Sequence, residues 1–327
     1  MREEDIRPAE LFERYLNLCR EDSYRHFHEA EREPLACPAC GHPESAPAFE
    51  KWGFQYVLCK ACETLYQSPR PLRRYFEGFY QGSASALYWA DHFFPSVAEA
   101  RRIHLFRPKV MEVAGLCAKD GFKPISIADI GAGYGIFLEE WKRIHRKMHV
   151  VAIEPNPVLA EVCRAKGFDV IESFLEDDFL LDPVDFVTAF EVIEHVHEPF
   201  FFLQRIRSLL REGGKMLLTG LTVDGFDIQI LWDQSKSISP PHHINFLSVK
   251  GVNMLLERAG FRKINVFTPG KLDVDIVGNA YREHPEILND QKFIRLLLGR
   301  GTETGKAFQR FLAEERLSSH CWIWAER

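Results

Sequence analysis

The sequence predicts an α/β fold built on a doubly wound sheet. From Ile125 onward, short apolar runs alternate with helical patterns, which is the rhythm of parallel strands joined by crossover helices. A glycine-rich turn at residues 129–135 lies between one such run and the helical pattern after it. Two C-x2-C pairs precede the sheet and indicate a separate, metal-stabilised segment. A chain of 327 residues has room for both parts, since a domain averages ~100–200 residues.

The composition is that of an ordinary globular protein, with 46% hydrophobic residues. A formal net charge of −6 gives no general attraction to nucleic acid or to anionic membranes, so neither is expected as a partner. No stretch approaches about 18 uninterrupted apolar residues, and the acidic first residues lack the basic-then-apolar pattern of a signal peptide. The sequence therefore predicts a cytoplasmic protein whose cysteines are reduced.

Residues 34–70 are predicted to form a zinc ribbon. Cys37 and Cys40 are followed after eighteen residues by Cys59 and Cys62, a spacing typical of four-cysteine zinc sites. Four thiolates close the coordination shell, so the zinc is expected to be structural rather than catalytic. A redox or disulfide pair is the alternative, which a reducing compartment disfavours. The ribbon carries two lysines and no arginine up to position 66, which disfavours a phosphate-tracking surface.

The glycine-rich turn places a carboxylate beside a ligand-binding backbone. Glycine is needed there because the tight turn requires unusual backbone angles, and because a ligand can approach a backbone that carries no Cβ. Asp129 stands two residues ahead of Gly131, where it would repel a pyrophosphate, and Ile136 breaks the dinucleotide-binding pattern. A carboxylate at the strand end suits a cationic ligand. A structural turn without a cofactor is the alternative.

The sequence Asp-x-Gly-x-Gly-x-Gly at residues 129–135 resembles the first motif of class I S-adenosylmethionine-dependent methyltransferases. The resemblance implies an enzyme with S-adenosylmethionine as cofactor and a seven-stranded, Rossmann-like methyltransferase sheet within residues 119–327. In that family an acid at the end of the second strand holds the ribose hydroxyls, and Glu154 matches this position, although nicotinamide enzymes use the same device. The expected donor-binding residues are Asp129, Gly131, Gly133, Tyr134, Glu154, Ser173, Phe174 and Phe190.

A second motif, Glu191-x-x-Glu194-His195, follows the predicted fourth strand. It resembles the Glu-x-x-Glu-His of ubiquinone-pathway O-methyltransferases and of small-RNA end methyltransferases, where these residues hold a divalent ion near the acceptor hydroxyl. A helical turn would place all three side chains on one face, and a metal ion would lower the pKa of a bound hydroxyl. Metal-independent relatives carry the same pattern, and then Glu191 would orient groups near the donor while His195 faces the acceptor. A capped helix start with a satisfied histidine is the structural alternative.

Residues 221–247 are predicted to form a long loop above the pocket, after the fifth strand. Sugar C-methyltransferases place a Tyr-x-Glu-His in this loop, and its histidine helps remove a proton from the acceptor carbon. Here His243 keeps the last position, but Pro241 and His242 replace the residues before it. O-methylation of a sugar hydroxyl is therefore a simpler expectation than C-methylation. His243 is expected to be the general base, with His195 second; a core histidine is the alternative for either.

A cysteine ribbon ahead of the motif-bearing domain resembles sugar and polysaccharide methyltransferases. This implies a small-molecule acceptor, a nucleotide-linked or glycan sugar, and a helical lid at residues 71–118. The aromatic residues of the lid are expected to form helix core, and its basic residues either to be solvated or to grip a diphosphate. These basic residues, with the one just before the lid, are Arg70, Arg73, Arg74, Arg101, Arg102, Arg107 and Lys109.

Two further segments complete the chain. Residues 1–33 are predicted to be a helical arm packed on the ribbon that follows. Residues 285–316 are predicted to be a helical insertion before the last strand, forming a cover or a homodimer surface. Two other functions remain open: a metal-assisted methyltransferase acting on RNA or on a quinone-type hydroxyl, and a non-catalytic zinc-ribbon scaffold.

Overall fold

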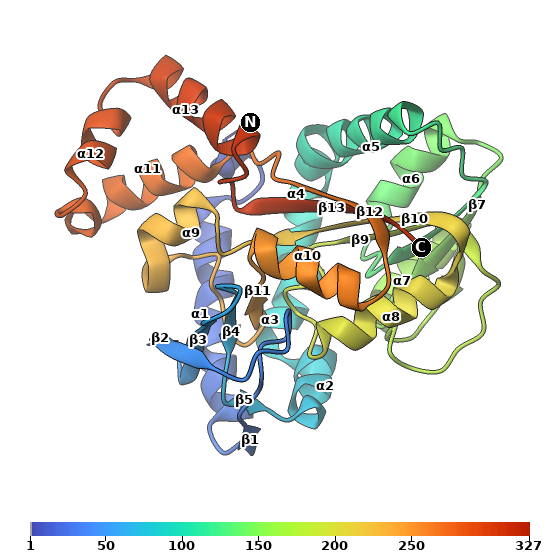
Figure 1. The fold of residues 1–327 in the computed structure, drawn as a ribbon, viewed down its shortest axis with the longest axis horizontal. Coiled ribbons are helices and arrows are strands. Elements are labelled where there is room, and N and C mark those ends of the chain that lie inside the picture. Colours follow the sequence, from blue (N-terminus) through green and yellow to red (C-terminus); the bar gives the residue numbers. More distant parts are fainter. Residues whose placement is uncertain (1) are drawn as a thin grey trace.

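The computed structural model describes residues 2–327. Its centre is a seven-stranded mixed sheet in the order β12-β13-β10-β9-β6-β7-β8 (Figure 1). The strands are β6 (Ser126–Ile130), β7 (His149–Ile153), β8 (Asp169–Ile171), β9 (Val184–Phe190), β10 (Leu210–Leu221), β12 (Arg262–Phe267) and β13 (His320–Glu326). Only β13 runs antiparallel to its neighbours, β10 and β12. The chain winds outward in both directions from the β6–β9 pair, so the predicted doubly wound α/β class is confirmed.

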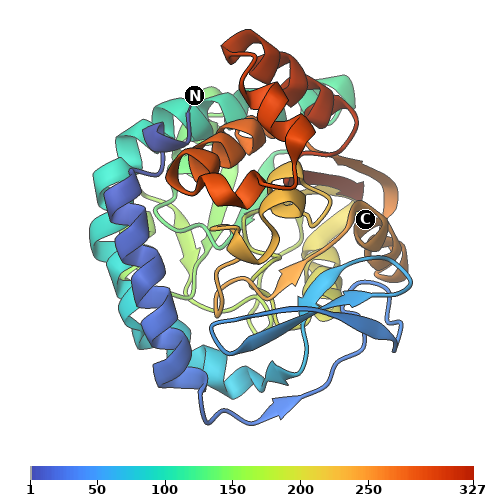
Figure 2. The same ribbon diagram turned by 90° about the vertical axis from the view of Figure 1, so that its left-hand side faces the viewer.

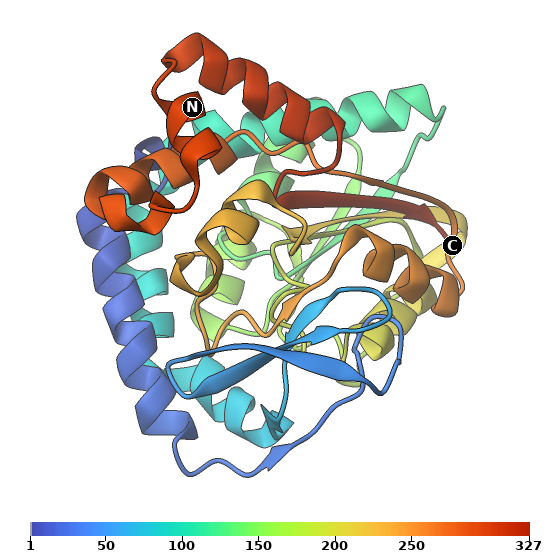
Figure 3. The same ribbon diagram turned by 60° about the vertical axis from the view of Figure 1, so that its left-hand side comes forward.

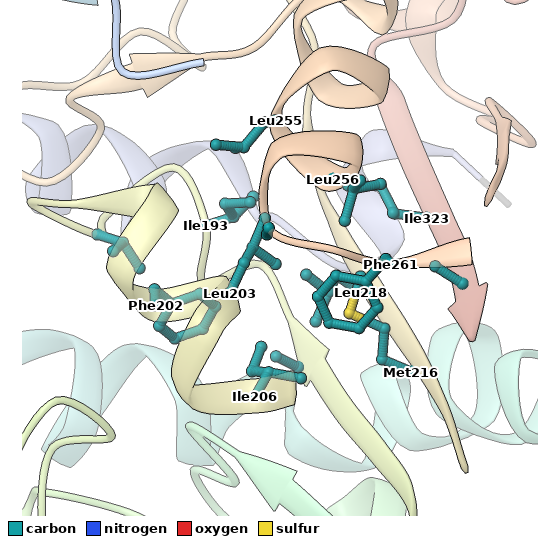
Figure 4. Close-up of a cluster of buried hydrophobic side chains, with 14 of the residues drawn as sticks. Ile193, Phe202, Leu203, Ile206, Met216, Leu218, Leu255, Leu256, Phe261 and Ile323 are labelled. Carbon is teal, nitrogen blue, oxygen red and sulfur yellow. The ribbon is translucent and has the colours of Figure 1, made fainter. Parts of the chain in front are cut away.

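Helices cover both faces of this sheet and bury its apolar side chains. The crossover helices are α6 (Ile136–Ile144), α7 (Pro157–Ala165), α8 (Pro199–Leu209) and α10 (Val249–Arg258). On one face, Leu203 of α8 and Leu255 of α10 belong to the same buried cluster as Leu218 of β10 (Figure 4). On the other, Trp141 of α6 packs against Phe186 of β9. Full burial of each such side chain stabilises the folded state by ~1.5–3 kcal/mol. This packing holds the strands, and so the site residues at their ends, in place.

The predicted ribbon is a small antiparallel sheet of β2 (Ser45–Lys51), β3 (Phe54–Cys59) and β4 (Leu65–Gln67). Its fourth strand, β11 (Asn245–Phe246), comes from the segment predicted to be a long loop. That segment also contains α9 (Phe226–Leu231) and a 3-10 turn at Trp232–Gln234, so the loop prediction for residues 221–247 was wrong. The partner of β11 is far away in sequence, and a two-residue strand leaves no periodic pattern. A second pair, β1 (Arg32–Glu33) and β5 (Arg70–Pro71), lies beside the ribbon.

The lid is α2 (Arg73–Gly82) followed by an almost continuous helix over residues 84–119. This helix consists of α3 (Ala84–Tyr88), a π-helical turn at Trp89–Phe93, α4 (Phe94–Arg101), a second π-helical turn at Arg102–Phe106, and α5 (Arg107–Lys119). Helix α1 (Ala9–Phe27) runs along it (Figure 2), with Tyr15 against Trp89. The arm therefore packs mainly on the lid, and it reaches the ribbon through Phe27 on Phe54. π-helical turns occur frequently at functional sites.

The insertion before the last strand begins earlier than predicted, with α11 (Asp273–Glu283). It continues through a 3-10 turn at Pro285–Leu288, α12 (Lys292–Leu298) and α13 (Thr302–Glu314), and it packs on α9 (Figure 3). A 3-10 turn at Glu3–Asp5 reaches α11, where the Glu3 backbone N–H donates to Asp275 Oδ2 over 2.7 Å. The homodimer surface stays a prediction. Within residues 2–327, no helix combines the length and the apolar composition that a membrane crossing requires.

Candidate active site

One cavity of about 1070 Å³ lies at the carboxyl ends of the central strands. It is lined by residues of the lid, of α1, of the 221–247 segment and of the segment leading into α11. Ligand pockets usually measure about 300–1,000 Å³, so this one has room for a donor and an acceptor together. All predicted donor-side and acceptor-side residues line it: Asp129, Gly131, Gly133, Tyr134, Glu154, Ser173, Phe174, Phe190, Glu191, His195 and His243.

Asp129 presents a buried carboxyl group to this cavity from the end of β6. The residue is only 2% exposed, and Thr188 Oγ1 donates to its Oδ1 over 2.6 Å. Burial raises the pKa of Asp129 to about 7, against the opposing effects of Thr188 and Lys109. A buried carboxylate without a cationic contact partner is costly, and a cationic ligand would relieve that cost.

The turn after β6 brings backbone close to the cavity. Gly131 has a φ of +66°, and a Cβ at this position would lie 3.0 Å from Val192 Cγ2, so a larger residue would be both strained and crowded. Glu154, at the end of β7, accepts hydrogen bonds from the backbone N–H groups of Gly133 at 2.7 Å and Asn156 at 2.9 Å. The second acid therefore holds the glycine turn in place while it lines the cavity.

The lid is fastened to the glycine turn through Tyr134. The ring of Tyr134 stacks on Phe94 of α4, with 4.4 Å between centroids and an interplanar angle of 3°. Its hydroxyl donates to the carbonyl of Ala90, one turn earlier in the lid. Ser173 and Phe174 follow β8, and the Ser173 hydroxyl donates to Asp177 over 3.3 Å. The predicted donor residues thus come from the ends of four strands, β6, β7, β8 and β9, and residues of the lid line the same cavity.

Glu191 lies apart from the other two residues of its motif. Its φ of +55° shows that the chain turns sharply there, so the predicted helical face shared with Glu194 and His195 was wrong. Its Oε1 accepts from Thr219 Oγ1 at 2.6 Å and lies 2.7 Å from His320 Nε2. Burial disfavours the charge, but His320 and Lys109 outweigh it and hold the pKa of Glu191 below its usual range.

Two histidines face one another on the acceptor side, with ring centroids 4.8 Å apart. His195 Nδ1 lies 2.9 Å from the carbonyl of His242, and His243 Nδ1 lies 2.6 Å from the carbonyl of Ser237. A carbonyl only accepts, so each Nδ1 must be the donor, which leaves each Nε2 with a free lone pair. Burial lowers the pKa of His195 to about 3 and of His243 to about 4, so both rings are neutral near pH 7.

Glu194 completes a group of three possible metal ligands with these histidines. The ligand atoms of Glu194, His195 and His243 all lie within 4.8 Å of one another. Glu194 is 1% exposed, and its Oε2 has no hydrogen-bond partner. A buried carboxylate oxygen without a partner, beside two neutral imidazoles held by backbone carbonyls, fits a divalent cation. Of the predicted set of Glu191, Glu194 and His195, the structure brings Glu194 and His195 together, and His243 lies with them instead of Glu191.

The four ribbon cysteines form a second cluster of possible metal ligands. Their Sγ atoms lie within 4.8 Å of one another, with Cys37 3.5 Å from Cys62 and Cys40 3.5 Å from Cys59. Four sulfurs at about 2.3 Å from a tetrahedral zinc would lie about 3.8 Å apart, so the cluster fits this ion.

The ribbon holds the chain around His243. The Tyr56 hydroxyl donates to the His243 carbonyl over 2.7 Å, and the Gln67 backbone N–H donates to the Ile244 carbonyl over 3.0 Å. Arg70 is fully buried and donates to Asn245 Oδ1 over 2.6 Å. The orientation of an acceptor-side residue therefore depends on strands more than 170 positions away.

Most of the basic residues predicted around the lid do not face the cavity. Arg70 is buried and donates to Asn245, and Arg74 pairs with Glu31 at the surface. Arg102 and Arg107 both pair with Glu140. For these four the diphosphate-gripping role is wrong, because their guanidinium groups already have protein partners. Arg73, Arg101 and Lys109 do line the cavity.

The model of one protein family, described as "Methyltransferase domain", matches residues 98–266. The chain belongs to this methyltransferase-domain family. The match begins within the lid and ends with β12, so it includes the glycine turn and the Glu-x-x-Glu-His motif. The ribbon and the insertion lie outside it.

Relatives of this methyltransferase domain match only part of the chain. The tRNA U34 carboxymethyltransferase of Shewanella piezotolerans is 26% identical over 182 residues, 53% of each protein. The ubiquinone biosynthesis O-methyltransferase of Xanthomonas oryzae pv. oryzae is 31% identical over 106 residues, 29% of this chain and 42% of that protein. The chain thus spans about half the length of the curated relatives it matches. Human N-acetylserotonin methyltransferase, solved with S-adenosylmethionine, is a similar structure with a TM-score of 0.49 and 14% identity, covering 79% of this chain and 60% of that one.

Several residues of the site were not predicted from the sequence. His320 and Thr219 hold Glu191, Thr188 holds Asp129, and Arg7 lines the cavity from a position before α1. None of them belongs to a motif, and each reaches the site from a distant part of the chain. His242, beside the predicted base, is 6% exposed and lies 3.1 Å from Ser85 Oγ, which gives it a place in the protein interior.

Proposed function

We propose that this protein transfers the methyl group of S-adenosylmethionine to a small-molecule acceptor. The observation that carries the proposal is the buried carboxylate of Asp129, which faces a large cavity beside the glycine turn of a methyltransferase domain. The methionine end of the donor carries an ammonium group and a sulfonium, which this carboxylate complements. Glu154 would hold the ribose hydroxyls, and Ser173 with Phe174 would lie against the adenine.

The bound donor supplies an already activated methyl group. The residues of the chain therefore have to align the acceptor in line with that methyl group, exclude water and accept the proton of the acceptor. Residues of the lid, the arm and the insertion also line the cavity and would help to exclude water. His243 is our first candidate for general base and His195 the second, because both present a free Nε2 to the cavity.

A sugar hydroxyl, nucleotide-linked or in a glycan, is the acceptor that we propose first. The support is the cavity itself, whose acceptor side joins a histidine pair to polar side chains, together with the cysteine ribbon that positions this pair. The names of the relatives point to tRNA and to ubiquinone biosynthesis, so an RNA nucleotide or a quinone-type hydroxyl is the alternative. The net charge of −6 favours a small molecule over RNA.

A metal-assisted reaction is a second candidate, favoured by the unpartnered oxygen of Glu194. Glu194, His195 and His243 would hold a divalent cation, which would lower the pKa of an acceptor hydroxyl. In that case the two histidines would be ligands, and their lowered pKa values suit ligands better than strong bases. We also propose a structural zinc ion at Cys37, Cys40, Cys59 and Cys62, and a cytoplasmic location.

Calorimetry with S-adenosylmethionine and its demethylated product tests the proposal. The wild-type chain is expected to bind both, and Asp129→Asn to bind neither at comparable concentration. Transfer of labelled methyl groups to a panel of sugars, quinols and RNA, with and without added magnesium or manganese, then identifies the acceptor and the need for a metal. A chain that binds no donor would instead be a non-catalytic scaffold.

A further inference from the structure

Two arginines line the cavity without a carboxylate partner. Arg7 precedes α1, and Arg101 is the last residue of α4. Within the part of the chain that the structure describes, neither guanidinium lies within 4.0 Å of a carboxylate, and Arg101 Nε is buried without a hydrogen-bond partner. The other basic side chains of the cavity wall have acidic neighbours: Arg73 with Glu77 at 3.1 Å, Lys236 with Glu13 at 2.6 Å, Lys271 with Glu112 at 2.8 Å, and Lys109 with Glu191 at 3.9 Å.

Aromatic rings hold both guanidinium groups. Arg101 Cζ lies 5.3 Å from the ring centre of Phe94 and 5.7 Å from that of Trp89. Arg7 Cζ lies 5.3 Å from the ring centre of Phe12. An aromatic ring stabilises a guanidinium without using its N–H groups, which therefore remain available to a ligand.

Both arginines line the cavity that His243 also lines. The charge of Arg7 lowers the pKa of Arg101, after the larger effect of burial. Glu191 is the nearby acid that opposes the shift at Arg101. Aromatic contacts also connect the two positions: Phe12, next to Arg7, lies 6.1 Å from Phe93 between ring centroids, and Phe93 stacks at 4.4 Å on Trp89, next to Arg101.

The placement of the arginines is built into the fold. Arg101 stands where α4 passes into the π-helical turn at Arg102–Phe106, and α4 is fixed to the glycine turn through Phe94. Arg7 follows the short turn whose residue Glu3 accepts from Asn279 of α11 over 2.8 Å. Neighbouring cations that are partly buried and lack a counter-charge are unfavourable, so this arrangement is expected where a ligand brings the missing negative charge.

We propose that the acceptor carries an anionic oxygen group, a phosphoryl group or a carboxylate, which binds between Arg7 and Arg101. The inference rests on the proposed function, since it names the class of acceptor for the same cavity. Guanidinium forks match the oxygens of both groups and form charge-assisted hydrogen bonds with them. An acceptor without this charge, such as a neutral quinol or a simple glycoside, would leave both arginines unpaired.

The test is calorimetric titration of the full chain with three sugars that differ in charge. Glucose 1-phosphate and glucuronate carry the two anionic groups, and methyl glucoside is the neutral reference. At least one anionic sugar is expected to bind ten or more times more tightly than methyl glucoside, and whichever does so identifies the group. Arg7→Gln and Arg101→Gln should each weaken this binding roughly 10–100-fold, as the loss of a charge-assisted hydrogen bond predicts.

Arg74→Gln is the matched control, because it removes the same charge from a surface pair with Glu31 outside the cavity. It should leave the affinity for the sugar within twofold of wild type. Equal affinity for all three sugars, or anion binding that survives both cavity variants, would overturn the inference. Titration with S-adenosylhomocysteine is run separately on every variant. If the wild-type chain does not bind S-adenosylhomocysteine, the proposed function is refuted. The sugar titrations use the unliganded chain, so they decide the role of the arginines in either case.

Discussion

The proposed donor side and the proposed acceptor side of the cavity are built in different ways. The donor side comes from strand ends and turns between Asp129 and Phe190, at the carboxyl ends of β6, β7, β8 and β9. The acceptor side draws on Arg7 before α1, Arg101 of the lid, His195 after β9 and His243 beside β11. A site made of neighbouring turns is specified by local sequence, whereas a site made of distant segments is specified by packing. The comparison predicts that variants of the two sides will affect different measurements.

His243→Ala is expected to give the largest effect, a fall in turnover of roughly 10²–10⁴-fold, whether the residue acts as general base or as metal ligand. The affinity for the donor should change little, since the side chain belongs to the acceptor side. Steady-state kinetics and donor calorimetry measure the two quantities. A variant that keeps the full rate would remove His243 from the chemistry.

Asp129→Asn should weaken donor binding by about 100-fold, because it removes the counter-charge of a buried cation while keeping the shape of the side chain. Binding of the anionic acceptor should stay close to that of wild type. Calorimetry with S-adenosylhomocysteine measures the first quantity and the sugar titration the second. Equal losses of donor affinity and of sugar affinity would show that the two sides do not bind their ligands independently.

The affinity for the donor is expected to depend on pH through Asp129. The pKa of Asp129 is raised to about 7, and only its ionised form complements the cationic donor. The affinity should therefore be constant above about pH 7 and fall below it, approaching tenfold per unit, with a proton released on binding in that range. Calorimetry in buffers of different ionisation enthalpy counts the proton. Asp129→Asn should lose this dependence; if the variant retains it, another group is responsible.

Asp227→Asn should give the smallest effect, on stability alone. Asp227 of α9 is fully buried with no hydrogen-bond partner for either oxygen, and burial together with Asp273 raises its pKa to about 8. The folded state therefore holds the proton of Asp227 more tightly than the unfolded state does. This contribution to stability is fully present below pH 3.8 and is lost as the pH rises through about 8. The neutral amide should therefore stabilise the protein by roughly 1–2 kcal/mol at pH 8. Thermal unfolding of wild type and variant at pH 5 and pH 8 measures this difference in stability. A variant whose stability depends on pH as steeply as that of wild type would contradict the prediction.

The sequence predicted the main sheet and the donor side because their signals are local. Asp129, Gly131, Gly133 and Glu154 lie within one strand-helix-strand unit, and all four line the cavity as expected. The acceptor side was predicted only in part. The positive φ of Glu191 separated it from Glu194, and nothing in the sequence indicated that His320 would lie 2.7 Å from it. Arg7 lies outside every motif, so only the fold shows that it lines the same cavity as Arg101.

The pairing of β11 with β4 restricts where this protein can be truncated or recombined. The hydrogen bonds between Asn245–Phe246 and Leu65–Tyr66 make the ribbon and the segment around His243 a single folding unit. Removing the ribbon would leave β11 without its hydrogen-bonded partner strand. Transferring residues 221–247 alone to another enzyme would likewise transfer β11 without β4. Recombination between such enzymes should therefore succeed only when both pieces are exchanged together.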